Sequence, residues 1–188
     1  MACDPFVLLT KNAVMAKASE LLGVLSAHLQ NDLTTHNRAI TDAIEVGPKI
    51  SKGENYLGLP YAILDFPRYF REHDVFAVRT MFWWGNFFSM TLHLKGNFRE
   101  HFRSHLTAAL PRMAEKDFQV CISEDEWEHH FGVDNYIPLA SLEKGLWEDL
   151  YDARTFTKLA VKWPVDDWNV VMGSLESTFA EFRSILGI

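Results

Sequence analysis

Two histidines four residues apart, His101 and His105, are the first residues in this sequence whose spacing could support chemistry. On a helix this spacing places both imidazoles on one side, where they could bind zinc or another transition metal if a third ligand converged. His93 or a distant carboxylate would complete such a set, as in a small metal-dependent hydrolase. However, the HExxH signature is absent, and Arg103 between the histidines would repel a cation. We therefore expect ordinary helix-surface histidines and keep metal binding as the alternative.

A second group combines carboxylates with histidines, and it looks like a metal or acid/base cluster. Ser123 followed by Glu126 matches the capping-box pattern of a helix start, where the helix dipole favours negative charge. The sequence therefore predicts a short, solvated helix that begins at Ser123 and runs to His130, with no chemistry of its own. Its charged and titratable members are Glu124, Asp125, Glu126, Glu128, His129 and His130.

Arg79 is the third candidate, because its neighbours in the expected strand are apolar. A guanidinium in such surroundings must find a partner or reach solvent at the sheet edge. Asp65, on the preceding strand, could supply a structural ion pair, and this is the interpretation we favour. In the alternative, Arg79 binds an anionic ligand through two hydrogen bonds. Together with Asp65 and His93 it would then form the pocket of an enzyme that needs no metal.

Aromatic residues gather between positions 56 and 88, where they could line a pocket for a flat apolar ligand. Aromatic side chains more often fill a core, and we favour that interpretation here. Trp84 and Phe87 lie beside the expected turn, so they would mark a partner contact if they were exposed. The group consists of Tyr56, Tyr61, Tyr69, Phe82, Trp83, Trp84, Phe87 and Phe88.

Motifs of known catalytic and cofactor-binding loops are missing from the sequence. It contains no GxSxG, no GxGxxG and no GxxxxGK[ST], so no cofactor is indicated, although residues distant in sequence could still converge. The two cysteines, Cys3 and Cys121, form no CxxC pair. We expect reduced thiols, as in a cytoplasmic protein.

The element that must position these residues is residues 75–95, VFAVRTMFWWGNFFSMTLHLK, which predicts a β-hairpin. Gly85-Asn86 suits a two-residue type II′ turn, because glycine tolerates the positive φ of the first turn position. This register pairs Thr80 with Thr91 and places Arg79 on an apolar face that packs on helices. The opposite, mixed face would carry Thr80, Trp84, Phe87, Ser89, Thr91 and His93.

The patterns in the rest of the sequence predict one α+β domain over residues 1–188. Its antiparallel sheet is built around this hairpin, and long N-terminal and C-terminal helices pack against the sheet. Pro67 is expected to end a short strand, and the lysines of the last strand are expected to be exposed, which is typical of a sheet edge. The expected elements are a helix from Pro5 to about Leu33, a loop over 49–59, a strand over 60–66, a helix capped by Asn97, an edge strand over 156–163 and a final helix capped by Asp166 or Asp167.

Composition narrows the class of protein. A chain of 188 residues with 48% hydrophobic and 13% aromatic residues is not a disordered protein. A net charge of −7 argues against nucleic acid as a partner. No apolar run approaches the ~20 residues that span a bilayer, and the N-terminus lacks the basic leader of a secretory signal. We therefore expect a cytoplasmic protein that does not bind membranes.

Together these features favour a non-enzymatic binding or interaction module that uses the mixed hairpin face, as a homodimer or with a small-molecule ligand. The two enzymatic alternatives are the metal-dependent hydrolase and the metal-free enzyme described above. The ligand-binding residues that we expect are Arg79, His93, Thr80, Thr91, Trp84 and Tyr61.

Overall fold

The computed structural model describes residues 5–33, 40–143 and 145–188. A seven-stranded sheet lies at its centre, in the order β1-β2-β3-β4-β7-β5-β6, and its neighbouring strands are antiparallel. The strands are β1 (Lys49–Tyr56), β2 (Leu59–Phe70), β3 (Val75–Trp83), β4 (Phe87–Lys95), β5 (Gln119–Cys121), β6 (Tyr136–Pro138) and β7 (Phe156–Pro164).

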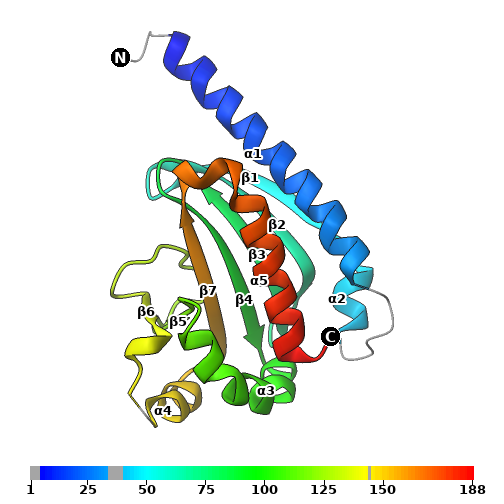
Figure 1. Cartoon of the computed structure of the whole chain (residues 1–188), viewed down its shortest axis with the longest axis vertical. Coiled ribbons are helices and arrows are strands. Elements are labelled where there is room, and N and C mark those ends of the chain that lie inside the picture. The colour runs from blue at the N-terminus through cyan, green and yellow to red at the C-terminus, as the bar shows by residue number, and fades with distance from the viewer. Residues whose placement is uncertain (1–4, 34–39, 144) are drawn as a thin grey trace.

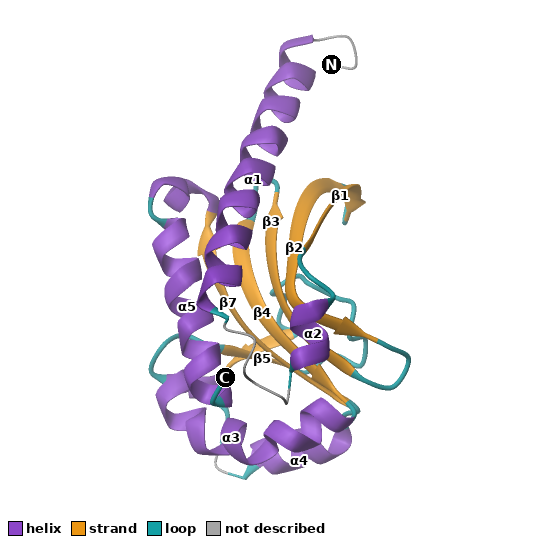
Figure 2. Cartoon of the chain, turned by 90° about the vertical axis from the view of Figure 1, so that its right-hand side faces the viewer, coloured by secondary structure: helices purple, strands orange, loops and turns teal. Residues whose placement is uncertain are grey.

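Helices cover one face of this sheet. The long helices α1 and α5 contact each other and pack on β2 and β4, and α3 packs on β3 and β4 (Figure 1, Figure 2). The predicted α+β class, with N-terminal and C-terminal helices on an antiparallel sheet, is therefore confirmed. The helices are α1 (Pro5–Asp32), α2 (Thr41–Glu45), α3 (Asn97–Ala114), α4 (Leu146–Ala153) and α5 (Val171–Leu186), with 3-10 turns at Leu139–Ser141 and Val165–Asn169.

The main core lies between these helices and the sheet. Apolar residues recur at three- and four-residue steps along α1 and α5, and on the strands they occupy every second position, so each element turns one apolar face inward. In the described ranges, no helix combines the length and the hydropathy needed to cross a bilayer. Buried members of this core include Leu22, Leu25, Phe76, Phe88, Met90, Leu92, Leu175 and Phe179.

The hairpin forms where the sequence predicts it, but the predicted register is wrong by one residue. The connection is the three-residue stretch 84–86, with Gly85 at φ 67°, so Trp83 rather than Trp84 pairs with Phe87. Thr80 consequently pairs with Met90, and Arg79 pairs with Thr91. Because side chains alternate between the two faces of a sheet, one extra turn residue moves every β4 side chain to the other face relative to β3.

Two predictions before the hairpin are also wrong. Residues 49–56 form the edge strand β1 rather than a loop, and their polar, mostly exposed side chains are typical of a solvated edge. Pro67 does not end β2, which continues to Phe70. The register of β2 against β3 shifts between Asp65 and Arg68, so Pro67 lies at a bulge where no ladder hydrogen bond from its nitrogen is needed.

Strand β7 is an interior strand and not the predicted edge. It pairs with β4 along its length and with β5 at Leu159 and Ala160. Lys162 is exposed as expected, but Lys158 is only 1% exposed. The charge of a lysine side chain by itself predicts exposure to solvent. Lys158 is buried because a loop from another part of the chain, which includes Glu128, folds over it.

Two helix starts also differ from the predictions. Asn97 is the first residue of α3 rather than its cap, and its backbone N–H donates to the Asp74 carboxylate over 2.6 Å. The last helix begins only at Val171, after the 3-10 turn that contains Asp166 and Asp167. In both cases the helix packs where expected, and only its first turn is displaced.

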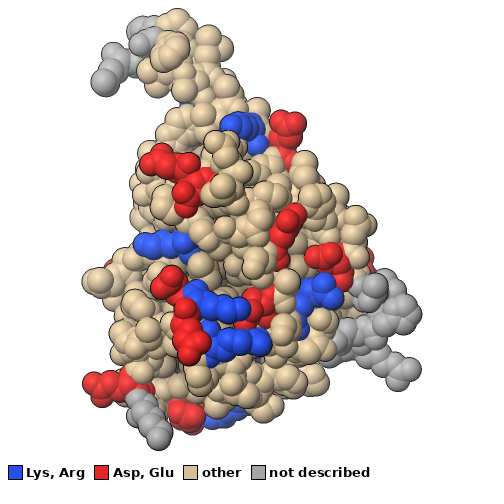
Figure 3. All heavy atoms as spheres, viewed as in Figure 1, with Lys and Arg blue, Asp and Glu red and all other residues tan. Residues whose placement is uncertain are grey.

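Acidic and basic side chains intermingle on the helix side of the molecule (Figure 3). Neighbours of opposite sign form ion pairs there, as Lys116 and Glu181 do over 2.6 Å.

Candidate functional site

The second face of the sheet, turned away from α1 and α5, is partly covered by the loop of residues 122–135. This loop joins β5 to β6 and contains neither helix nor strand, so the predicted helix from Ser123 to His130 is wrong. Its polar side chains reach the sheet instead of building a helix turn. Long loops without secondary structure are often functional in compact domains.

The first contact of this loop is with the ion pair of Arg79 and Asp65. These residues are directly opposite on β3 and β2, and Nε and Nη2 of Arg79 donate to the two Asp65 carboxylate oxygens over 2.7 and 2.9 Å. The predicted ion pair is therefore confirmed. Nη1 of Arg79 lies 3.0 Å from Nε2 of His129. Since arginine can only donate, His129 must accept and is neutral, and burial, followed by the charge of Arg79, lowers the pKa of His129 to about 2.

Glu126 forms the second contact. Its Oε2 lies 3.1 Å from Nε2 of His93, and its Oε1 accepts a hydrogen bond from Nζ of Lys95 over 2.6 Å. Both partners are on β4 and point to the same face. Burial lowers the pKa of His93 to about 4, so His93 is neutral at pH 7 and donates through Nε2. Chiefly this hydrogen bond, with that from Lys95, lowers the pKa of Glu126 to about 2.

Lys158 lies beside His93, directly opposite it on β7. Its Nζ donates to the backbone carbonyl of Glu128 and lies 5.3 Å from the ring centre of Tyr136. No carboxylate within ion-pair distance of Lys158 is found among the described residues. Burial lowers the pKa of Lys158 to about 8, because the ammonium is costly to hold away from water.

Tyr56, at the end of β1, anchors the far side of the loop. Its hydroxyl donates to the Glu128 carboxylate over 2.9 Å and accepts hydrogen bonds from the backbone N–H groups of His129 and His130. Burial raises the pKa of Tyr56 to about 12, so the hydroxyl remains a donor at neutral pH. Burial also raises the pKa of the nearby Cys121 thiol, which donates to the side chain of Asn135, so Cys121 is a packed thiol and not an activated nucleophile.

We call this set the polar site. Its charged members are three cations and two carboxylates, and its two histidines are neutral, so it carries an excess of one positive charge in a region with little water. Groups on four strands and one loop converge in it. The polar site consists of Asp65, Arg79, His93, Lys95, Glu126, His129 and Lys158.

The structure brings only some of the predicted ligand-binding residues together. Arg79, His93 and Thr91 lie on the second face, and Tyr61 lies on the same face over Gly53 of β1. Thr80 and Trp84 do not belong to this set, because the corrected register turns them toward the helices, where Thr80 is 1% exposed. The mixed face predicted for a dimer contact is thus divided between the two sides of the sheet.

The second face is buried beneath the loop at the positions where a partner contact was expected. Phe87, Ser89, Thr91 and His93 are each less than 9% exposed. The predicted pocket of Arg79, Asp65 and His93 also differs in detail, since Arg79 contacts His129 while His93 contacts Glu126.

The sequence pattern predicts a solvated helix for Glu126 and His129 and an exposed position for Lys158, so it does not reveal that these three residues belong to the site. One signal could have revealed the site. A three-residue turn at Trp84–Asn86 puts Arg79 and His93 on one face, and polar residues on one buried face require polar partners from elsewhere in the chain.

The two histidines of the metal-binding alternative lie far from the polar site, on the surface of α3. His101 and His105 are exposed on α3, and no group of three His, Cys, Asp or Glu side chains within residues 5–33, 40–143 and 145–188 could hold a metal ion. The metal alternative therefore lacks its third ligand in this part of the chain.

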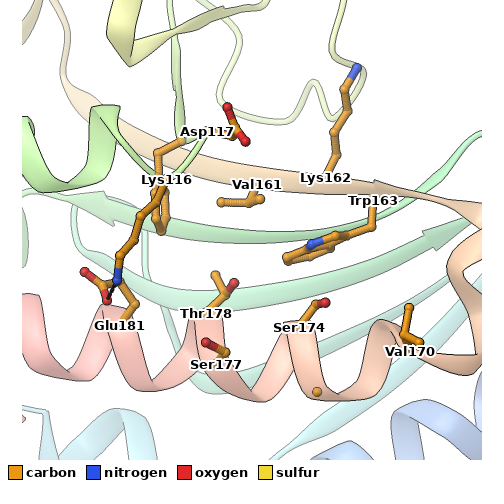
Figure 4. A pocket seen from close by; sticks show the side chains of 12 residues that line it. Lys116, Asp117, Val161, Lys162, Trp163, Val170, Ser174, Ser177, Thr178 and Glu181 are labelled. Atoms are coloured by element: carbon orange, nitrogen blue, oxygen red, sulfur yellow. Dashed lines mark hydrogen bonds and ion pairs between the residues drawn. The ribbon is translucent and has the colours of Figure 1, made fainter.

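A groove on the helix side differs from the polar site in its chemistry. It has a volume of about 560 Å³ and lies between α5 and β7, with Val161 and Trp163 at its floor (Figure 4). Its lining charges include Lys116 and Glu181, which are paired with each other. The groove is lined by no histidine or cysteine, so we place the candidate site on the opposite face.

Comparison of the chain with protein-family models, with curated proteins and with solved structures found no match.

Proposed function

We propose that this protein binds a small anionic ligand in the polar site between the sheet and the 122–135 loop. The observation that carries the proposal is the convergence of Arg79, Lys95 and Lys158 on one largely buried region. Among the described carboxylates near these cations, Asp65 and Glu126 are the ones whose side chains are mostly buried, at 7% and 15% exposed. Such an excess of positive charge in a region of low dielectric attracts an anion more strongly than the same charges would in water.

Stability alone does not explain these buried charges. Replacement of buried ion pairs by well-packed apolar residues is often neutral or stabilising. The adjacent part of the same face is closed in that apolar manner, by Ile63, Met81, Trp83 and Phe87. The charged half of the same face instead keeps paired ions, which supports a role in ligand binding.

The proposal includes a reducing, cytoplasmic compartment. In its support, Cys121 is a free, buried thiol, and free thiols persist where glutathione and thioredoxin keep them reduced.

Titration calorimetry with acetate, succinate, citrate and inorganic phosphate tests the proposal. The variant Lys158→Met removes one cation of the polar site, and Lys162→Met is its matched control, because Lys162 is exposed on the same face of the same strand. We expect at least one of these anions to bind. Its affinity should fall about tenfold or more in Lys158→Met, since a hydrogen bond to a charged group contributes about 1.5–3 kcal/mol.

Lys162→Met should bind as the wild type does. Failure of all four anions to bind to the wild type and to Glu126→Ala, which removes the carboxylate between His93 and Lys95, would refute the proposed function. Equal losses in Lys158→Met and Lys162→Met would show that binding takes place elsewhere.

A second candidate function, catalysis without a metal, is favoured by one observation. Lys158 is a buried amine whose pKa is lowered to about 8, so a substantial fraction is unprotonated in mildly alkaline solution. Such an amine attacks the carbonyl carbon of a substrate and forms a Schiff base, and the carbonyl oxygen leaves as water. Incubation with pyruvate and cyanoborohydride should then increase the mass of the peptide that contains Lys158 and leave the Lys162→Met protein equally reactive. Labelling spread over exposed lysines would refute this candidate.

A further inference from the structure

Glu126 is the only carboxylate that the 122–135 loop contributes to the polar site. Its side chain is 15% exposed, and its two oxygens have different partners, His93 on one side and Lys95 on the other. These partners are two residues apart on β4, so a rigid strand sets the distance between the donors. The result is a preformed seat for one carboxylate group.

The residues on either side of Glu126 face outward. Glu124 and Asp125 are exposed, and Trp127 is 49% exposed although its ring contacts Phe70 and His93. Glu126 is therefore an inward-pointing side chain in a segment that otherwise lies at the surface.

The backbone of this segment is hydrogen-bonded mainly to itself. Asp125 N–H donates to Ser123 Oγ, Trp127 N–H donates to the Asp125 carboxylate, and Glu128 N–H donates to the Asp125 carbonyl. The ties from residues 124–127 to the rest of the described chain are side-chain contacts, and no sheet ladder includes them. The segment can therefore move outward without breaking a strand pairing, as a low-stability local opening.

We propose that Glu126 is a tethered occupant of a carboxylate-binding seat, and that a small-molecule carboxylate takes its place between His93 and Lys95 when the segment of residues 124–127 moves outward. This inference rests on the proposed function and specifies the ligand class and the regulation of the same site. The ligand is a carboxylic acid because the seat already holds a carboxylate, with one N–H donor, one ammonium and the charge of Lys158 nearby.

The apparent affinity of the wild type then equals the affinity of the free seat multiplied by the fraction of molecules in which Glu126 has left it. The two contacts of Glu126 are charge-assisted hydrogen bonds, and their free energy favours the arrangement in which Glu126 occupies the seat. Part of that free energy is offset by desolvation of the groups involved, so we expect the closed arrangement to weaken ligand binding about tenfold to a hundredfold.

Glu126→Ala tests the inference as a gain of binding, with acetate as the probe because it replaces the deleted carboxylate. Glu124→Ala is the matched control, since Glu124 belongs to the same segment and its side chain is 89% exposed. Calorimetry should show that acetate binds to Glu126→Ala at least about tenfold more tightly than to the wild type or to Glu124→Ala. Acetate should also restore the midpoint of thermal unfolding of Glu126→Ala.

Each result separates the two proposals. Equal acetate affinity of the wild type and Glu126→Ala would overturn the tethered-occupant inference and leave the proposed function standing. No binding of any carboxylate to folded Glu126→Ala would overturn the inference, and failure of phosphate to bind as well, to both this variant and the wild type, would overturn the proposed function. Should Glu126→Ala not fold, hydrogen exchange of the wild type decides: saturating acetate must accelerate exchange in residues 123–128, and unchanged or slower exchange would overturn the inference.

Discussion

Two histidines buried in the neutral form should make this protein sensitive to mild acid. Burial is the main cause that lowers the pKa of His93 to about 4 and that of His129 to about 2. In the unfolded chain both side chains titrate near pH 6.5. Below that pH the unfolded chain therefore binds protons that the folded chain does not bind. Stability from these two groups is fully present above pH 6.5 and is lost as the pH falls.

The size of the effect follows from proton linkage. An imidazole with a pKa of 6.5 binds about a quarter of a proton at pH 7 and nearly a whole proton at pH 5, whereas the folded His93 and His129 stay almost unprotonated. Each histidine then lowers the free energy of unfolding by about 2 kcal/mol between pH 7 and pH 5, or about 3 to 4 kcal/mol for both. Such a loss is a large part of the ~5–15 kcal/mol that stabilises a typical domain.

Urea denaturation followed by circular dichroism at pH 7, 6 and 5 measures this loss. In the double variant His93→Gln, His129→Gln the loss should shrink by about 3 to 4 kcal/mol, because glutamine retains hydrogen-bonding groups but does not titrate. His101→Gln, an exposed change on α3, should follow the wild-type profile. Equal stability of the wild type at pH 7 and pH 5, or an undiminished loss in the double variant, would refute the assignment of neutral histidines.

Three further predictions concern single substitutions, all measured by urea denaturation at pH 7. Arg79→Met should cost about 3–5 kcal/mol because it leaves Asp65 buried without its partner, whereas Arg103→Met breaks an exposed ion pair and should cost less than about 1 kcal/mol. A comparable cost for both would contradict the buried pairing. Gly96→Ala should cost more than about 2 kcal/mol, because φ is 61° and the added Cβ would lie 2.1 Å from a backbone carbonyl oxygen. Gly23→Ala, in the exposed and uncrowded middle of α1, should instead stabilise the protein by about 0.5–1 kcal/mol, and a loss there would show that α1 is not helical at this position.

Local patterns in the sequence are sufficient to predict the fold class and one contact of the polar site, the ion pair of Arg79 and Asp65. Apolar residues at helical steps predicted α1, α3 and α5, and alternation with β-branched and aromatic residues predicted β3, β4 and β7, because these signals depend only on near neighbours in the chain. The ion pair of Arg79 and Asp65 was also predictable, since a guanidinium on a buried strand requires a carboxylate on a neighbouring strand.

Tertiary structure alone decided the composition of the polar site. The chemistry of Gly85-Asn86 is compatible with a turn of two or three residues, and only the packing of both faces selects the three-residue connection that puts Arg79 and His93 together. Glu126 and His129 follow a helix-start pattern, yet the cations on β3, β4 and β7 draw them onto the sheet. Lys158 is buried because a loop distant in sequence covers its strand. Burial and partner charges arise from segments far apart in the chain, so the neutral histidines and the carboxylate seat are properties of the fold and not of any local stretch of sequence.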